Sequence, residues 1–326
     1  MTHSDSHPEP KVDVLIIGAG ASAAAFAWSL ADTKMNILCL EQGDWTKPHD
    51  YPSTRMSWES ENVANANPNY RGNAADYPVN TKDSPIAIAN YNGVGGGTVL
   101  FAGHFPRFHP SDFRAKTLDG VADDWPISYG QLAPFYDAND EMMGVAGMEG
   151  DPAYPAVPRK VPNMPPLPMG RSGVALAKGF NELGWHWWPS DMAIATTQYD
   201  GRDKCINLGA CGSGCAQGAK ASTDVTYWPH AIRAGVRLKT WCRVKEITTD
   251  ANGQATGVTY FDVDGNQHRQ EAEMVVLACN GIGTPRLLLN SASSQHPDGL
   301  ANSSGMLGRN LMFHPYASVE GVFTEA

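Results

Sequence analysis

A short β-branched run, a glycine turn and an alanine-rich segment constrain the fold of this chain more than any other feature. Residues 12–17, VDVLII, predict a buried strand, and GAGASAAAFAWSLA after it predicts a tight turn and a helix to about Leu30. A second strand, NILCLE, ends on Glu41, 21 residues after Gly20. Strand, tight turn, helix and strand form the βαβ unit of an α/β protein with a parallel sheet.

The turn has the spacing of a dinucleotide-binding fingerprint. Gly18 permits the turn, Gly20 lets a pyrophosphate approach the backbone, and Ala23 is the small residue at the third position. The helix N-terminus would supply N–H donors and a positive dipole, and Glu41 would accept hydrogen bonds from ribose hydroxyls. The context favours a bound dinucleotide over an empty βαβ turn, but the motif alone does not separate FAD from NAD.

Two later segments offer further contacts to such a ligand. NGVGGGTVLFAGHF, from Asn92, holds four glycines in five residues, and a backbone without side chains can lie against a flat ligand. A flexible linker is the alternative, but the apolar run VLFA directly after the glycines argues against it. A buried strand, MVVLAC, ends in small residues before a helix opened by Thr284-Pro285, which is a second place for a cofactor to touch an α/β sheet.

Charge and cysteine content exclude several classes of protein. A net charge of −10 argues against a nucleic-acid binder, which needs a basic footprint. No run approaches the ~18 apolar residues of a membrane helix, and the start of the chain lacks a secretory pattern. Six cysteines in 326 residues argue against a disulfide scaffold. A cytoplasmic location is therefore the default expectation.

Three of the six cysteines lie together in CINLGACGSGCAQGAK, residues 205–220. Cys205, Cys211 and Cys215 form a C-x5-C-x3-C pattern among glycines. Thiolates on such a loop suit an iron–sulfur cluster, and three of them match the ligand count of a [3Fe–4S] cluster. Zinc would want a fourth ligand, and a disulfide between two of the thiols stays open. Lys220 and Ser222, which follow, would cap the next helix or fix the loop, and we assign them no chemistry.

The order of the segments resembles the N-terminal part of the glucose-methanol-choline (GMC) family of FAD oxidoreductases. The matching pieces, in family order over nearly the whole chain, are VDVLIIGAGASAAAFAWSLA, ILCLEQG, GVGGGTVLFAG, WPISYGQLAPFYDANDEMMGV, TYWPHAIRAGVRLKTWCRVKEI, MVVLACNGIGTPRLLLNS and GMLGRNLMFHP. The resemblance implies a Rossmann-like α/β fold of the GMC/p-hydroxybenzoate hydroxylase type. The FAD-binding domain would span 1–310, with surface excursions at about 45–90 and 148–220, and a substrate-binding domain would begin at 311–326.

The resemblance also implies which residues hold FAD. Those expected at the cofactor are Gly18, Gly20 and Ala23 at the pyrophosphate, Glu41 at the adenosine ribose, Gly96, Gly97 and Thr98 by the isoalloxazine, Val244 at the adenine, and Ala278 at a further contact. Some family members attach FAD through a His just after the glycine loop. Because that position falls near Val99 and Leu100 here, we expect non-covalent FAD.

The activity implied by the resemblance is oxidation of a CH–OH group in a sugar or other alcohol. In the family a neutral His takes the hydroxyl proton as hydride moves to the flavin. That His lies near the C-terminus of family members, so we expect this chain to hold the cofactor half and a C-terminal partner chain or missing segment to supply the base.

The cysteine pattern is similar to that of catalytic subunits of iron–sulfur FAD sugar dehydrogenases in the same family. This implies electron exit to a cytochrome or quinone-linked partner, and export to the periplasm bound to a partner would be compatible with the absence of a signal. Other family members carry cysteines in this turn without a cluster. Both interpretations therefore stay open.

Overall fold

The computed structural model describes residues 10–57, 79–80, 82–85, 90–153, 159–313 and 319–322, and it centres on a six-stranded mixed sheet. The strand order is β3-β2-β1-β6-β5-β4. The strands are β1 (Val12–Ile17), β2 (Ile37–Leu40), β3 (Arg237–Lys239), β4 (Arg243–Thr249), β5 (Ala255–Phe261) and β6 (Gln267–Leu277). The helices are α1 (Ala21–Leu30), α3 (Ala115–Asp119), α4 (Tyr129–Met143), α5 (Gly170–Leu183), α6 (Tyr227–Arg233) and α7 (Asn280–Asn290).

The predicted strand–turn–helix–strand unit is present as β1, α1 and β2. Strands β1 and β2 pair in parallel, with Val14 opposite Ile37 and Ile17 opposite Leu40. On its other side β1 pairs in parallel with β6, so it lies in the interior of the sheet. A strand covered on both faces has no solvent side, which is why VDVLII and ILCL are nearly continuous apolar runs.

Side chains of β2 divide between the two faces of the sheet. Ile37 and Cys39 belong to a core formed with α1 and α6, in which Trp228 is completely buried. Leu38 and Leu40 belong to a second core, formed with β4, β5 and α7. This alternation follows from the two-residue period of a strand. The structure therefore has the α/β architecture predicted from the sequence, with one core on each face.

The antiparallel part of the sheet curls over the parallel part. Strands β3 and β4 lie at opposite ends of the strand order, yet only residues 240–242 separate them. Such a link spans at most about 14 Å, whereas the edges of a flat six-stranded sheet lie about 24 Å apart. The long strand β6 makes the curl possible, because its residues 267–271 pair with β5 and its residues 272–277 pair mainly with β1.

This link differs from the sequence-based prediction of one strand through VRLKTWCRVKEITTD. The chain breaks at Trp241, whose φ is +57°, in the left-handed region. Backbone N–H groups of Trp241 and Cys242 donate to the carbonyls of Gly43 and Glu41, at 3.0 and 2.8 Å. These bonds hold the turn beside the end of β2. The strand propensity of the local sequence does not indicate them.

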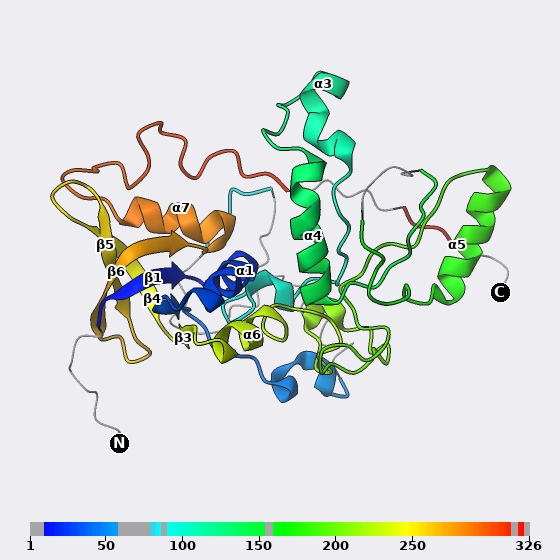
Figure 1. The fold of residues 1–326 in the computed structure, drawn as a ribbon, viewed down its shortest axis with the longest axis horizontal. Helices are drawn as coiled ribbons and strands as arrows, with labels where there is room; N and C mark the ends of the chain where they lie inside the picture. Colours follow the sequence, from blue (N-terminus) through cyan, green and yellow to red (C-terminus); the bar gives the residue numbers. More distant parts are fainter. Residues whose placement is uncertain are drawn as a thin grey trace.

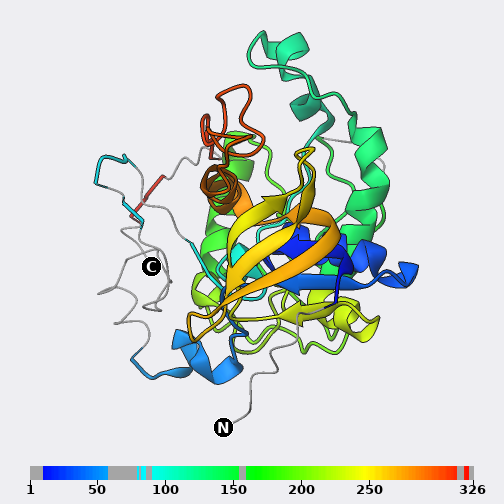
Figure 2. The same cartoon turned by 90° about the vertical axis from the view of Figure 1, so that its left-hand side faces the viewer.

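Helices α3, α4 and α5 extend away from the sheet. Figure 1 shows the strands at one end of the molecule and α5 at the other, with α4 between them, and Figure 2 looks onto the strands from their own end. The cysteine loop and α5 both belong to the predicted excursion at 148–220. Much of the predicted excursion at 45–90 and part of the segment 311–326 lie outside the described residues, and the predicted boundary after residue 310 stays a prediction. No helix in the described part of the chain is long and apolar enough to cross a membrane.

Candidate functional site

A cavity of about 650 Å³ lies at the carboxyl ends of β1 and β2. The expected cofactor residues that line it are Gly18, Gly20, Glu41, Gly96, Gly97, Thr98, Val244 and Ala278. They come from five separate segments of the chain. The carboxyl edge of parallel strands is where ligands of open α/β sheets bind, so the position agrees with the role expected for these residues.

Two glycines allow the walls of this cavity to come together. Gly18 has a φ of +90°, and a Cβ there would lie 2.8 Å from the carbonyl oxygen of Ala278. Gly96 has a φ of +52°, and a Cβ there would lie 2.8 Å from Cα of Gly20. Real side chains do not tolerate such distances. The glycine turn and the glycine loop therefore contact each other backbone to backbone, as a site for a flat or extended ligand requires.

The N-terminus of α1 opens into the cavity. Its N-cap is Gly20, which has no side chain to accept from the first-turn N–H groups. Ala21 and Ser22, the first two helical residues, line the cavity. Unsatisfied N–H groups at the positive end of a helix form a natural phosphate site. Together with the glycine contacts, this end of α1 fits the pyrophosphate of a dinucleotide such as FAD.

Glu41 is buried at the end of β2 and braces the glycine turn. Its Oε2 accepts from the N–H of Ala19 at 2.7 Å, and its Oε1 accepts from the N–H of Gly43 at 2.9 Å. Burial raises the pKa of the Glu41 carboxyl, and the hydrogen bonds from Gly43 and Ala19 oppose the rise. Each carboxylate oxygen has a second lone pair. The carboxylate could therefore also accept a ribose hydroxyl, and its contact with the ribose stays a prediction.

Ala23 does not line the cavity. It is fully buried within α1, in the core shared with β1 and α6. A small third residue in this fingerprint lets the helix pack closely on the strand. From the family pattern we expected Ala23 at the pyrophosphate. Its contribution there would instead be indirect, through the packing of α1 on the strand.

Side-chain hydroxyls brace the glycine loop from behind. Thr98 Oγ1 donates to the carbonyl of Gly95 at 2.6 Å and accepts from the N–H of Thr223 at 3.0 Å. The Thr223 hydroxyl also donates to the Gly95 carbonyl, at 3.3 Å. Thr98 lines the cavity beside the glycines, as expected, but its hydroxyl is engaged within the protein. Thr223 was not identified from the sequence as a residue that supports the glycine loop. It lies in the stretch GAKAST, to which we assigned no chemistry.

Several residues around the cavity were not expected from the sequence. They are aromatic, amide or cationic, and comprise Asn90, Asn92, Phe101, His104, Phe105, Arg286 and Phe313. The apolar run after the glycine loop was a usable signal for Phe101, His104 and Phe105. Asn90 and Asn92 directly precede the glycines of that loop, whereas Arg286 and Phe313 come from distant segments that only the fold brings to the cavity.

The three clustered cysteines lie apart from the lining of this cavity. Cys205, Cys211 and Cys215 are partly exposed free thiols, and the N–H of Asn207 donates to the Cys205 sulfur at 3.3 Å. Burial raises the pKa of the Cys211 thiol, and the neighbouring thiols of Cys215 and Cys205 add to the rise. Among the described residues, no group of three or more His, Cys, Asp or Glu side chains is arranged to hold a metal ion. The arrangement therefore does not fit a cluster, which stays a prediction from spacing.

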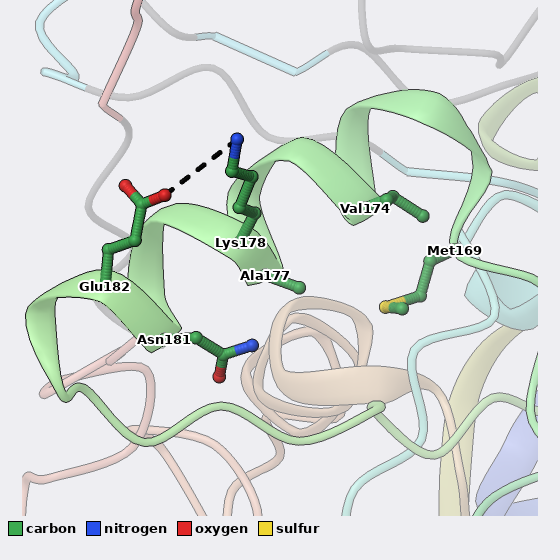
Figure 3. A pocket seen from close by; sticks show the side chains of 6 residues that line it. All are labelled: Met169, Val174, Ala177, Lys178, Asn181 and Glu182. Carbon is green, nitrogen blue, oxygen red and sulfur yellow. Dashed lines mark ion pairs between the residues drawn. The ribbon is translucent and has the colours of Figure 1, made fainter.

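A second hollow lies on α5, far from the expected cofactor residues. It is lined by Met169, Val174, Ala177, Lys178, Asn181 and Glu182. Figure 3 shows these side chains around one face of the helix, where Lys178 and Glu182 form an ion pair with Nζ and Oε1 3.9 Å apart. None of the residues expected at the cofactor lies here, so we place the candidate site in the cavity at the sheet.

Known proteins resemble this chain over most of its length. Residues 12–316 match the family described as GMC oxidoreductase. The chain is 45% identical over 309 residues to 2-methyl-1,2-propanediol dehydrogenase of Mycolicibacterium austroafricanum, covering 93% of this chain and 55% of that protein. It is 32% identical over 327 residues to the fructose dehydrogenase large subunit of Gluconobacter japonicus, covering 93% and 58%. The chain thus spans little more than half the length of these relatives.

Solved structures agree with the fold. Pyridoxine 4-oxidase from Mesorbium loti superposes with a TM-score of 0.55 at 20% identity, covering 86% of this chain and 52% of that one. Formate oxidase of Aspergillus oryzae RIB40 also superposes with a TM-score of 0.55, at 16% identity, covering 88% and 48%. At these identities the likeness extends to the fold alone.

Proposed function

The chain belongs to the GMC oxidoreductase family, and from that premise we propose that it is the FAD-binding part of an enzyme that oxidises a CH–OH group of a sugar or other alcohol. The observation that carries the proposal is the convergence of the glycine turn, the glycine loop, Glu41, Val244 and Ala278 on one cavity. The names of the relatives, which include a diol dehydrogenase and a fructose dehydrogenase subunit, support the substrate class.

The residues of this chain would bind and orient the cofactor. FAD, when bound, supplies the hydride acceptor. The N-terminus of α1 would hold its pyrophosphate, and Glu41 would fix the adenosine ribose. The glycine loop, with Phe101 and Phe105 beside it, would cover one side of the cavity and exclude water. Exclusion of water strengthens every electrostatic interaction in such a site.

We expect the base that takes the substrate proton to come from outside the matched segments. His104 lines the cavity, but it follows the glycine loop and not the C-terminal motif that carries the base in the family. A test of this chain without a C-terminal partner chain therefore decides where the base lies. If this chain alone, loaded with FAD, is reduced quickly by an alcohol, a base within it suffices and the partner segment is not needed.

The test is anaerobic reduction of the bound flavin. The chain, together with the partner chain or segment proposed to supply the base, is loaded with FAD and mixed with 2-methyl-1,2-propanediol, fructose or a primary alcohol, and the visible flavin absorbance is followed. We expect loss of the oxidised-flavin band with at least one polyol. A protein that binds no FAD, or whose flavin stays oxidised with every alcohol although dithionite reduces it, would contradict the proposal.

A second proposal concerns the route by which electrons leave. The spacing of Cys205, Cys211 and Cys215 in the sequence supports a [3Fe–4S] cluster and an electron-transfer partner. The cysteine loop would have to rearrange to bind it, since the described residues form no metal-binding group. The alternative is a cluster-free oxidase or dehydrogenase.

Iron analysis separates these two possibilities. Anaerobically purified protein should contain roughly three iron atoms per chain if the cluster is present. Cys211→Ser should then lose most of the iron while retaining FAD. Iron far below one atom per chain, with flavin present, would leave the cluster-free enzyme, and formation of peroxide during turnover would identify it as an oxidase.

A further inference from the structure

A buried lysine joins the cavity wall to the cysteine loop. Lys220 is 1% exposed, and its Nζ lies within hydrogen-bonding distance of four backbone carbonyls. These belong to Thr98 at 3.3 Å, Val99 at 2.7 Å, Phe101 at 2.7 Å and Cys211 at 2.9 Å. The ammonium therefore takes its polar contacts from two separate loops.

The energetics of Lys220 require both loops to stay in place. A buried ammonium that loses its hydrogen-bond partners is left without compensation for the water it gave up, which is strongly unfavourable. The side chain has lost most of its water on burial. Its carbonyl ligands replace that water, so movement of either loop leaves part of the charge unsolvated.

One of the two loops is the wall expected to contact the flavin. The carbonyls of Thr98 and Val99 belong to the short 3-10 turn Gly96–Val99, and Phe101 follows it. Thr98 and Phe101 line the cavity. The Lys220 Nζ also lies 5.0 Å from the centre of the Phe101 ring, within the range of a cation–π contact. Lys220 thus contacts residues 98–101 on the side of their loop opposite the cavity. The cavity side of the same loop would face the cofactor.

The other end of the connection is the thiol loop. The carbonyl that accepts from Lys220 belongs to Cys211, the first residue of the turn Cys211–Ser213. The backbone at Lys220 is itself fixed, because Ile194 and Lys220 form an antiparallel bridge and the N–H of Ala221 donates to Ala193 at 2.9 Å. Since the lysine is anchored, displacement of one loop is not readily absorbed by motion of its own backbone.

We propose that Lys220 is a positioning residue that couples occupancy of the cavity to the order of the cysteine loop. A cofactor that packs against residues 96–101 would hold their carbonyls around Nζ, and the same ammonium would then hold the Cys211 turn. The coupling is reciprocal, so disorder of the cysteine loop would weaken cofactor binding by the same factor. The inference rests on the proposed binding of FAD in this cavity.

Hydrogen exchange of the protein with and without FAD tests the coupling. FAD should slow amide exchange in residues 96–101 and also in residues 211–215, by at least about fivefold, the lower end of a typical coupling. Helix α5, which is remote from the cavity, should show no change. FAD binding is measured in parallel by quenching of flavin fluorescence.

A variant series assigns the effect to Lys220. Lys220→Met keeps the volume and removes the donors, and should abolish protection at 211–215 while protection at 96–101 remains. Lys220→Arg, which keeps donors and charge, should restore part of the protection at 211–215. Lys178→Met, on the surface of α5, is the control and should behave as wild type.

The outcomes distinguish this inference from the proposed function. If FAD binds and protects residues 96–101 but leaves 211–215 unchanged in the wild type, the coupling is wrong and the FAD site stands. If FAD does not bind at all, the proposed function fails first. Should Lys220→Met not fold, the comparison within the wild-type protein still decides the coupling.

Discussion

At the scale of single residues, close backbone contacts shape this site more than reactive side chains do. Gly18 and Gly96 each stand where a Cβ would lie 2.8 Å from another backbone atom. Glu41, the acid at the end of β2, accepts hydrogen bonds from two backbone N–H groups of the surrounding turns. Such residues act by letting the chain approach the ligand, so their substitution should affect binding before chemistry.

Replacement of Gly96 by alanine should impair folding and FAD binding together. The left-handed φ and the clash with Gly20 Cα should cost about 1–3 kcal/mol of stability and weaken FAD binding at least about tenfold. Urea unfolding and flavin titration measure the two effects. Gly97 lacks a left-handed φ, and a Cβ there meets nothing within 4 Å, so Gly97→Ala should fold normally. Equal stability of the two variants would contradict the argument.

Replacement of Glu41 by glutamine should weaken the glycine turn. The amide would place an N–H₂ donor against the N–H of Ala19 or Gly43, each of which now donates to a carboxylate oxygen. An unsatisfied buried group of this kind costs about 1–3 kcal/mol, and we expect FAD affinity to fall as well. Calorimetry with and without FAD measures both. Glu273→Gln, at an exposed ion pair, should stay close to wild type.

At the scale of elements, local signals and tertiary contacts decided different parts of the structure. Ser128 and Gln131 form a capping box at the start of α4, a signal visible in the sequence SYGQ. Farther along α4, Asp137 and Asp140 accept hydrogen bonds from the buried guanidinium of Arg107, at 2.7 and 2.6 Å. The cap sets where the helix begins, and the ion pairs fix it to the segment that follows the glycine loop.

Loss of the α4 cap should have a small, measurable effect. Ser128 accepts from the Gln131 N–H at 3.4 Å, and its own N–H donates to Gln131 Oε1 at 2.9 Å. Ser128→Ala should lower the free energy of unfolding by about 1 kcal/mol without changing the affinity for FAD. Chemical denaturation gives the first number and flavin titration the second. Ser294→Ala, in an exposed loop, serves as the control, and an equal effect there would remove the cap explanation.

At the scale of the whole molecule, buried groups on both sides of the sheet should make the protein sensitive to alkali. Burial raises the pKa of the Cys279 thiol to about 12, and the charge of Glu41 adds to the rise. Burial likewise raises the pKa of Tyr227 to about 12, and that of Cys39 well above its usual value. Lys220 is shifted the opposite way, to about 8.

The sign of the alkaline effect follows from these shifts. Between about pH 9 and 12 the unfolded chain loses the thiol proton of Cys279 while the folded chain keeps it, so stability falls as pH rises, by up to about 1.4 kcal/mol per pH unit for each such group. Lys220 contributes an opposite slope between about pH 8 and 10.5, and the tyrosines add to the loss only above about pH 10. Urea unfolding at about pH 10.5 and about pH 12 should therefore show a net loss of stability. Cys279→Ala should lose less than wild type, and equal losses would contradict this assignment.

The sequence by itself determined the βαβ unit, the dinucleotide-binding glycine turn, the glycine loop and the family. These features depend on residues close together in the chain, where β-branched runs, glycine spacing and the position of Glu41 have direct conformational meaning. The break at Trp241 and the curl of β4 and β5 over the parallel strands were decided by tertiary contacts, since backbone groups of Gly43 and Glu41 bind a segment about 200 residues away. The same holds for Lys220: its sequence context suggested only a loop-fixing residue, but the fold places its amine among carbonyls of the neighbouring cysteine loop and of the distant glycine loop, between the cavity and the cysteines. Local pattern does not specify such contacts, because they form only when the whole chain brings their partners together.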